Sequence, residues 1–264
     1  MAARVVLTRP AERQEALQKA LSARGFEVLS LPALSIEPSA IGQPPSPEAF
    51  DWMVFVSRAA WQHYWYVLRK QRPHFVWPAS CRLVAVGAMT AQYIKQSLYS
   101  ATGQVVSVLS SPPDDKQDSE SLWQIWQPAL TSGARVLIVR GQDGRNWLLT
   151  ALREQGYRPE IFEAYRRAPI AWPRESVATL KAWAEQARLG VWLITSSEGL
   201  LAIEAQWAAL QWDPWRPNGA VVIHPRLASP VKAWLGQAPV VVTKPDDEEI
   251  IEALNAGFDS GTFV

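Results

Sequence analysis

The chain has very little of several things that whole classes of protein need. Cys81 is the only cysteine in 264 residues, so no intramolecular disulfide can form and a reducing compartment is expected. The 26 lysines and arginines are balanced by 25 acidic residues, which argues against a nucleic-acid or membrane partner, because such surfaces need clustered positive charge. No apolar run approaches the length of a membrane span or a signal-peptide core. We therefore expect a cytoplasmic protein.

Motifs for several familiar chemistries are also missing. The sequence has no G-x-G-x-x-G or G-x-x-x-x-G-K-[ST] loop for nucleotide phosphates, and no G-x-S-x-G turn for a nucleophilic serine. The histidines, His63, His74 and His224, show no metal-ligand spacing with one another or with Cys81, so no metal site is predicted. We interpret His63, which lies in the segment WQHYWY, as a partly exposed helical residue rather than a catalytic one.

What the chain does have is a regular alternation of strand-like and helix-like segments. Such alternation predicts an α/β fold in which a parallel sheet carries helices on both faces. The strands are expected at residues 4–8, 26–31, 52–57, 82–87, 104–109, 136–140, 191–195, 220–224 and 239–243. The helices that the pattern places most clearly run from Pro10 to Gly25, begin near Ala59, Thr90 and Ser119, and close the chain from Asp246 to about Leu254.

The sequence also repeats itself weakly, with similar segments in its two halves. The matching pairs are 7–13 (LTRPAER) with 139–145 (VRGQDGR), 55–59 (FVSRA) with 194–198 (ITSSE), and 86–91 (VGAMTA) with 223–228 (IHPRLA). The segments occur in a different order in the two halves. This predicts two similar flavodoxin-like, doubly wound domains, one of them discontinuous. Residues 1–35 and 172–264 would form the discontinuous domain around an inserted domain of 41–164, with two side-by-side linkers at about 36–40 and 165–171.

Hydroxyl groups and arginines follow the predicted strands. In parallel sheets, ligands bind beyond the carboxyl ends of the strands, and helix N-termini with serine, threonine and arginine side chains suit carboxylates or phosphates. The alternative for each serine is that it merely caps the helix after it. The candidate binding residues at these strand ends are Arg9, Ser57, Arg58, Thr90, Arg140, Ser196, Ser197 and Arg226.

Tyr165 stands out at the second predicted linker, where Arg166 and Arg167 follow it. A tyrosine hydroxyl there could donate a proton or a hydrogen bond to a leaving oxygen. The alternative is a buried aromatic residue at a hinge.

Taken in order, these segments resemble the uroporphyrinogen-III synthase family over nearly the whole chain. The segments that carry the resemblance are 7–10 (LTRP), 31–38 (LPALSIEP), 54–57 (VFVS), 84–87 (VAVG) with 90–91 (TA), 139–141 (VRG) with 144–145 (GR), Gly156, 165–167 (YRR), 194–199 (ITSSEG) and 224–228 (HPRLA). Each segment alone is weak, but their order and spacing are specific. The chain departs from the common pattern at Arg58–Trp61 and in its Ser110–Asp118 loop.

The resemblance implies two α/β domains with an active site in the cleft between them, and an enzyme that needs no cofactor. The implied reaction closes a linear hydroxymethylbilane, a polycarboxylate tetrapyrrole, into uroporphyrinogen III with inversion of ring D. By the same resemblance, Tyr165 matches the family's linker tyrosine, proposed to assist departure of the hydroxyl, and Thr90 matches a threonine at a helix start in the cleft.

Two other functions remain open from the residues alone. A non-catalytic two-domain clamp for an anionic small molecule would need the same kind of site. A regulatory flavodoxin-like module would instead need an acidic strand-end pocket, where this sequence has hydroxyls and arginines. A clamp that must open favours a monomer.

Overall fold

The computed structural model describes residues 2–11, 14–39, 42–212 and 215–263. Its contacts divide the chain into two compact units, unit 1 (Met1–Ser35 and Ala168–Val264) and unit 2 (Ile36–Arg167). The end of the first predicted linker, residue 40, and the start of the predicted inserted domain, residue 41, lie outside the described residues, as do residues 12 and 13 of the first repeat. Within the described part of the chain, no helix has the length and apolar character to cross a membrane.

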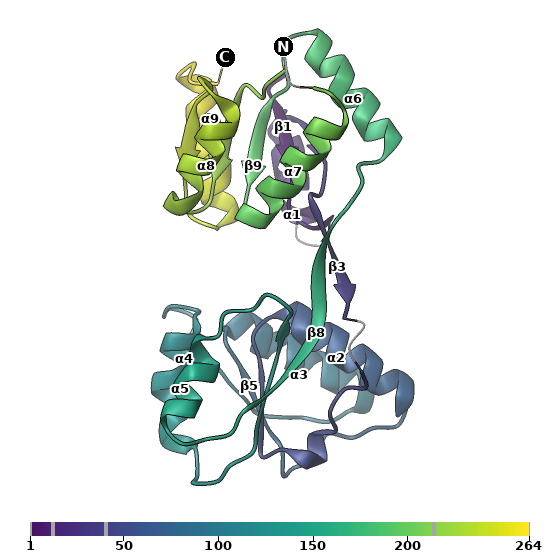
Figure 1. Cartoon of the computed structure of the whole chain (residues 1–264), viewed down its shortest axis with the longest axis vertical. Helices are drawn as coiled ribbons and strands as arrows, with labels where there is room; N and C mark the ends of the chain where they lie inside the picture. The colour runs from purple at the N-terminus through teal and green to yellow at the C-terminus, as the bar shows by residue number, and fades with distance from the viewer. Residues whose placement is uncertain (1, 12–13, 40–41, 213–214, 264) are drawn as a thin grey trace. The chain divides into compact units, whose positions relative to one another are not determined.

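Unit 1 is built on a five-stranded sheet in the order β11-β10-β9-β1-β2. Its strands β1 and β9 lie side by side in Figure 1. All its neighbouring strands pair in parallel. The bounds of the strands are β1 Arg4–Leu7, β2 Glu27–Ser30, β9 Val191–Ile194, β10 Gly219–Val222 and β11 Val240–Val242.

The two faces of this sheet bury separate apolar clusters. Alternate residues of β1 show the division, because Val6 packs in one cluster and Val5 and Leu7 in the other. One face is covered by α6 (Arg174–Glu185), α7 (Ser197–Ala209) and α8 (Pro225–Leu235). The other face is covered by α1 (Glu15–Ala23) and α9 (Asp247–Asp259).

Unit 2 contains most of the second sheet, whose order is β3-β8-β7-β4-β5-β6. The strands from β8 to β6 pair in parallel. Strand β3 runs antiparallel to β8. Backbone hydrogen bonds join Ala33 to Ile170 at the start of β3 and Ser39 to Ala164 at its end, so the two segments run in opposite directions. The strand bounds are β3 Leu34–Pro38, β4 Trp52–Phe55, β5 Arg82–Ala85, β6 Val108–Leu109, β7 Val136–Gly141 and β8 Glu160–Pro169.

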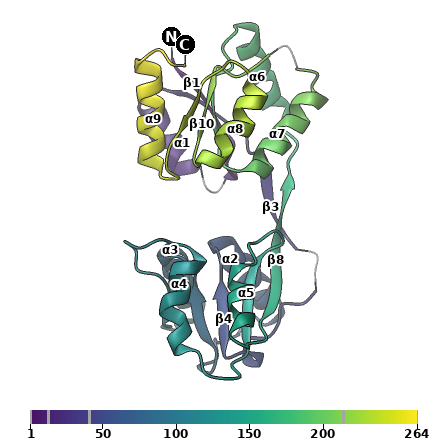
Figure 2. The same ribbon diagram turned by 60° about the vertical axis from the view of Figure 1, so that its left-hand side comes forward.

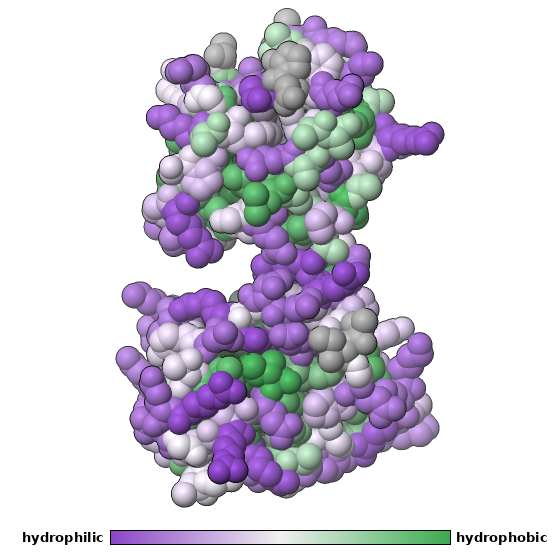
Figure 3. Space-filling model, in the orientation of Figure 1, coloured by the Kyte–Doolittle hydropathy of each residue, from purple (hydrophilic) through white to green (hydrophobic). Residues whose placement is uncertain are grey.

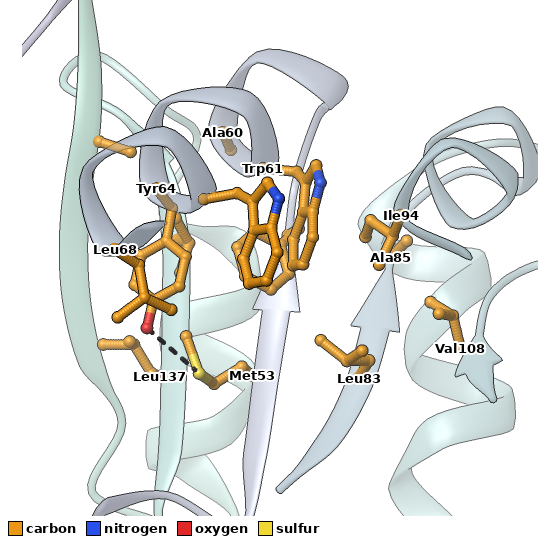
Figure 4. Close-up of a cluster of buried hydrophobic side chains, with 14 of the residues drawn as sticks. Met53, Ala60, Trp61, Tyr64, Leu68, Leu83, Ala85, Ile94, Val108 and Leu137 are labelled. Carbon is orange, nitrogen blue, oxygen red and sulfur yellow. Dashed lines mark hydrogen bonds between the residues drawn. The ribbon is translucent and has the colours of Figure 1, made fainter. Parts of the chain in front are cut away.

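Helices cover both faces of this sheet as well. Figure 2 shows α4 (Ser119–Trp126) and α5 (Trp147–Glu154) in front of it, with α2 (Arg58–Gln71) and α3 (Ala88–Thr102) behind. The core under α2 and α3 is aromatic, and Trp61 and Tyr64 are fully buried against Met53 and its neighbours (Figure 4). Short 3-10 turns lie at Pro47–Ala49 and Gln127–Ala129. Hydrophilic residues cover most of the face drawn in Figure 3.

The two sheets share one arrangement of strands. Written from one edge, unit 1 reads β11-β10-β9-β1-β2 and unit 2 reads β6-β5-β4-β7-β8, followed by β3. The repeated sequence segments occupy matching places, because each pair follows β1 and β7, β9 and β4, or β10 and β5. The two units therefore share one strand arrangement but follow it in a different chain order. The predicted α/β fold class with parallel sheets is confirmed.

Some elements differ from the sequence expectation. Helix α1 begins at Glu15, so Pro10 precedes the helix and does not form its first turn. Of the expected strand 104–109, only Val108–Leu109 pairs with the sheet. The segment around Tyr165, expected as a linker, belongs to the ten-residue strand β8.

Candidate functional site

Ser57 lies at the carboxyl end of β4 and is the N-cap of α2. Its Oγ accepts a hydrogen bond of 3.2 Å from the backbone N–H of Ala60. The same oxygen lies 3.3 Å from the hydroxyl of Tyr165, and either atom could be the donor. The capping alternative for Ser57 is therefore correct, and it leaves the serine hydroxyl in contact with the tyrosine.

Tyr165 reaches Ser57 because β8 contains a bulge. Arg140 of β7 pairs with Glu163 of β8, whereas the next residue, Gly141, pairs with Tyr165. Ala164 is thus an extra residue, and such an insertion re-aims the side chains that follow it. The tyrosine is buried, with 6% of its surface exposed, and its ring packs on Gly141. A Cβ at position 141 would lie only 2.7 Å from Cζ of the ring.

Two further residues of α2 stand close to this pair. His63 is half-buried, and its ring centroid lies 5.9 Å from that of Tyr165. Arg58 is exposed, and its guanidinium carbon lies 4.1 Å from the centre of the Tyr93 ring, a cation–π arrangement that supports the arginine without neutralising it.

Thr90 is the third residue of α3 and is half-buried. The first N–H of the same helix, that of Ala88, donates to Oε1 of Gln117 at 2.6 Å. The Gln117 amide group in turn donates to the carbonyl oxygens of Pro112 and Asp115, at 2.6 and 2.8 Å. The Ser110–Asp118 loop therefore covers the start of α3.

Arg140 is almost entirely buried, with 8% of its surface exposed. Its Nη1 donates to the carbonyl oxygen of Gly144 at 2.8 Å and to Oδ1 of Asn146 at 2.7 Å. Its Nη2 lies 3.5 Å from a carboxylate oxygen of Glu163. Most of the guanidinium therefore holds the turn after β7, although its buried Nε has no partner among the described residues.

In unit 1, the carboxyl ends of β9 and β10 present comparable groups. Ser196 is the N-cap of α7, and its Oγ accepts from the N–H of Gly199 at 3.0 Å, while Ser197 is exposed. At the start of α8, the exposed Arg226 gives its backbone N–H to Nδ1 of the capping His224 at 3.2 Å. This leaves the side chain of Arg226 as the group that can reach an anion there.

Arg9 follows β1 and is engaged in an ion pair. Its Nη1 lies 2.6 Å from Oδ1 of Asp247, in the first turn of α9. The N-terminus of α9 is already satisfied, because the Asp246 carboxylate accepts from the N–H groups of Glu248 and Glu249. The anion-binding capacity of unit 1 therefore concentrates at α7 and α8.

Of the residues expected from the sequence, the structure brings Ser57 and Tyr165 into direct contact. It places Arg58, Thr90, Ser197 and Arg226 at helix starts, and it commits Arg9 and much of Arg140 to contacts within the chain. Sequence reasoning missed Gly141 as the floor under Tyr165 and Gln117 as the cover of α3. Gly141 lay inside a quoted motif, whereas nothing in the sequence marks Gln117.

The site offers hydrogen-bond donors and no ligand set for a metal. Among the described residues, no group of three or more His, Cys, Asp or Glu side chains could hold a metal ion. Hydroxyls, helix N-termini and arginines suit carboxylates, and a tyrosine hydroxyl can transfer a proton.

Comparison with known proteins points in one direction. The family model for "Uroporphyrinogen-III synthase HemD" matches residues 15–252. Curated relatives include uroporphyrinogen-III synthase from Salmonella typhimurium, 24% identical over 95% of this chain and 99% of its own. The Escherichia coli enzyme of that name is 26% identical over 67% of this chain and 68% of its own.

Solved structures show the same fold. The uroporphyrinogen-III synthetase of Helicobacter pylori aligns with a TM-score of 0.59 at 15% identity, covering 97% of this chain and 99% of that one. A mutant uroporphyrinogen III synthase from Thermus thermophilus gives 0.51 at 18%, covering 98% and 100%. Since the family model spans most of the sequence, the chain belongs to the uroporphyrinogen-III synthase family of porphyrin biosynthesis.

Proposed function

We propose that this protein is a uroporphyrinogen-III synthase, a lyase that cyclises hydroxymethylbilane to uroporphyrinogen III with loss of water. Membership of the family supports the reaction class. The observation that carries the assignment to particular residues is the contact of 3.3 Å between the hydroxyls of Tyr165 and Ser57, at the carboxyl edge of a parallel sheet.

In this proposal, Tyr165 assists the first step. Its hydroxyl donates a proton or a hydrogen bond to the terminal hydroxyl of the substrate, which departs as water while the adjacent pyrrole nitrogen supplies the electron pair. Ser57 orients the tyrosine, because the hydrogen bond from the N–H of Ala60 fixes the position of the serine Oγ. Tyr165 then acts as a catalytic residue and Ser57 as a positioning residue.

The later steps need geometry more than they need reactive side chains. The azafulvene left by water loss is attacked by the already substituted carbon of ring D, which forms a spiro intermediate. The older bond between that carbon and the methylene bridge to ring C breaks, which restores ring D as a pyrrole and leaves a second azafulvene on ring C. The free α-carbon of ring D then attacks that methylene carbon, and loss of the proton from the α-carbon restores the aromatic ring. Holding a flexible chain in the spiro-forming conformation is a task of positioning.

Substrate carboxylates supply the means of positioning. We assign their contacts to the exposed Arg58 and Arg226, to the hydroxyl of Thr90, and to the start of α7 at Ser196 and Ser197. A capping serine still has its hydroxyl hydrogen to donate, so capping and carboxylate binding are compatible. Arg140 holds the turn beside β7 and Arg9 holds α9, so both support the site from within the chain.

The test is a product analysis. Freshly generated hydroxymethylbilane is incubated with the protein, and the products are oxidised and separated as isomers. We expect mainly the type III isomer, while a matched incubation without protein gives the type I isomer of spontaneous closure. Type I product alone would remove the catalytic assignment and leave the ligand clamp as the remaining hypothesis.

A further inference from the structure

Unit 2 contains a cavity of about 460 Å³ that the proposed reaction does not use. It lies among Trp52, Arg82, the residues just before β5, and the segment that leads into β6. Trp52 and Arg82 are the first residues of β4 and β5, whereas Ser57 follows the end of β4. A four-residue strand is about 13 Å long, so the cavity opens at the opposite edge of the sheet from the Ser57–Tyr165 pair.

The cavity exists because the chain leaves the sheet before β6. Residues 104–109 have the sequence QVVSVL, yet only Val108 and Leu109 pair with β5. Gln104 instead binds the backbone of Trp77, accepting from its N–H at 2.9 Å and donating to its carbonyl at 2.7 Å. The space between this detached segment and β5 is left open.

The walls are apolar and held in place. The indole of Trp77 is 3% exposed and donates from Nε1 to the carbonyl oxygen of Cys81 at 2.8 Å. Trp52 packs edge-on against Trp126, with ring centroids 5.9 Å apart. A volume of this size, with apolar walls, falls in the range of preformed sites for small organic ligands, roughly 300–1,000 Å³.

One side chain of the lining is charged. The guanidinium carbon of Arg82 lies 5.0 Å from the Trp52 ring centre, and no carboxylate among the described residues lies within ion-pair distance of it. Cys81, by contrast, contributes an apolar surface, because burial raises the pKa of its thiol to about 12 and keeps it protonated at neutral pH. The cavity thus combines apolar walls with one available cation.

We infer that this cavity is a second binding site, separate from the carboxyl edge, for a small, mainly apolar molecule that bears one acidic group. The apolar part contacts Val106 and the edges of Trp52 and Trp77, and the acidic group reaches Arg82. Val105, whose side chain belongs to the cavity rim, is 87% exposed and gives the ligand a further apolar contact. The inference does not depend on the proposed reaction.

Two fluorescent probes test it, 1-anilinonaphthalene-8-sulfonate and N-phenyl-1-naphthylamine, which share one ring system and differ by the sulfonate. The full-length protein is expected to bind one molecule of each, with energy transfer from tryptophan. Arg82→Gln is expected to weaken the sulfonate probe about two- to fivefold, the effect of one partly exposed ion pair, and to change the uncharged probe less than twofold.

Blocking variants show where the probes bind. Ala79 and Ala129 line the cavity and are exposed, so Ala79→Trp and Ala129→Trp fill it from the rim without altering the core. Either variant, folded as judged by circular dichroism, should abolish binding of both probes, and Gln96→Trp on the exposed side of α3 should not. Probe binding that survives both blocked variants would overturn the inference. A second result would also overturn it. If sedimentation shows that the wild type is a dimer and that both blocked variants are monomers, the cavity is a contact between copies of the chain.

Discussion

Gly141 decides where the ring of Tyr165 can lie. With a Cβ at 141 only 2.7 Å from Cζ of the tyrosine, Gly141→Ala forces the ring to move. We expect a loss of about 1–3 kcal/mol in the free energy of unfolding, the usual cost of overpacking a buried site. The measurement is urea unfolding in a double-mutant cycle. In a Tyr165→Ala background the same substitution should cost much less, and equal costs in both backgrounds would contradict the contact.

Tyr165→Phe keeps the packing on Gly141 and removes only the hydroxyl. If this hydroxyl assists departure of water, type III formation should slow by a factor of about a hundred to ten thousand without being abolished. The readout is the initial rate of type III product. Tyr66→Phe is the matched control, since Tyr66 is 63% exposed on α2 and should keep the wild-type rate. A wild-type rate for Tyr165→Phe would remove the tyrosine from the chemistry.

The sequence predicted which residue types occupy the candidate site, but it did not predict the directions in which their side chains point. A serine after a strand predicts a helix cap, and Ser57 and Ser196 both cap helices. An arginine near a strand end can be exposed, like Arg58 after β4, or fold back onto the next turn, like Arg140 near the end of β7, and the residue type alone does not distinguish the two cases. The deciding groups, Gly144 and Asn146, become visible as its partners only in the fold.

At the scale of elements, two substitutions of Ser196, the N-cap of α7, distinguish its contribution to stability from its contribution to substrate binding. Ser196→Ala removes the acceptor for the Gly199 N–H and should cost about 0.5–2 kcal/mol in the free energy of unfolding. Ser196→Asp keeps a capping acceptor and adds a negative charge where we propose a substrate carboxylate. It should therefore retain most of the stability while raising KM. Chemical unfolding and steady-state kinetics of both variants test this, and an unchanged KM for Ser196→Asp would contradict carboxylate binding at α7.

The ion pair between Glu48 and Arg72 ties the turn at Pro47–Ala49 to the end of α2. The hydrogen bond from Arg72 lowers the pKa of Glu48 from 4.5 to about 2. Because the folded pKa is depressed, the pair stabilises the fold above about pH 4.5, and this contribution disappears as the pH falls towards 2. Both side chains are nearly half exposed, so the contribution at neutral pH should be only about 0.2–1 kcal/mol.

Urea unfolding at pH 7 and pH 2.5 measures this contribution. Glu48→Gln should be less stable than the wild type at pH 7, and the difference should shrink at pH 2.5. Glu154→Gln, at an exposed position near the end of α5, serves as the control and should show no such pH dependence. A difference that is as large at pH 2.5 as at pH 7 would contradict the role of the ionised carboxylate.

Strands β4 and β7 were easier to predict than β6 and β8 for a physical reason. Strands β4 and β7 are buried throughout, so they read as continuous apolar runs. Residues 104–109 (QVVSVL) also predict a strand, but Gln104 bonds to Trp77 and draws the start of the segment off the sheet. The second predicted linker, residues 165–171, begins inside strand β8, where Tyr165 pairs with Gly141.

For the whole molecule, the weak repeats carried the most information. They paired segments that occupy the same places in the two sheets, although the chain enters the two layouts at different strands. A repeat of this kind is visible in sequence because each βα turn needs the same small set of residues at its strand end. The detachment of residues 104–107 and the cavity beside them have no counterpart in the repeats, so they could not be foreseen.

The most direct test of the central claim is the initial rate of type III formation as a function of protein concentration, with hydroxymethylbilane in large excess. We expect the rate to rise in proportion to the protein concentration and each protein molecule to form many molecules of type III product. Type III product that never exceeds the protein in amount, or type I product throughout, would contradict catalysis and identify the molecule as a binder of the linear tetrapyrrole at most.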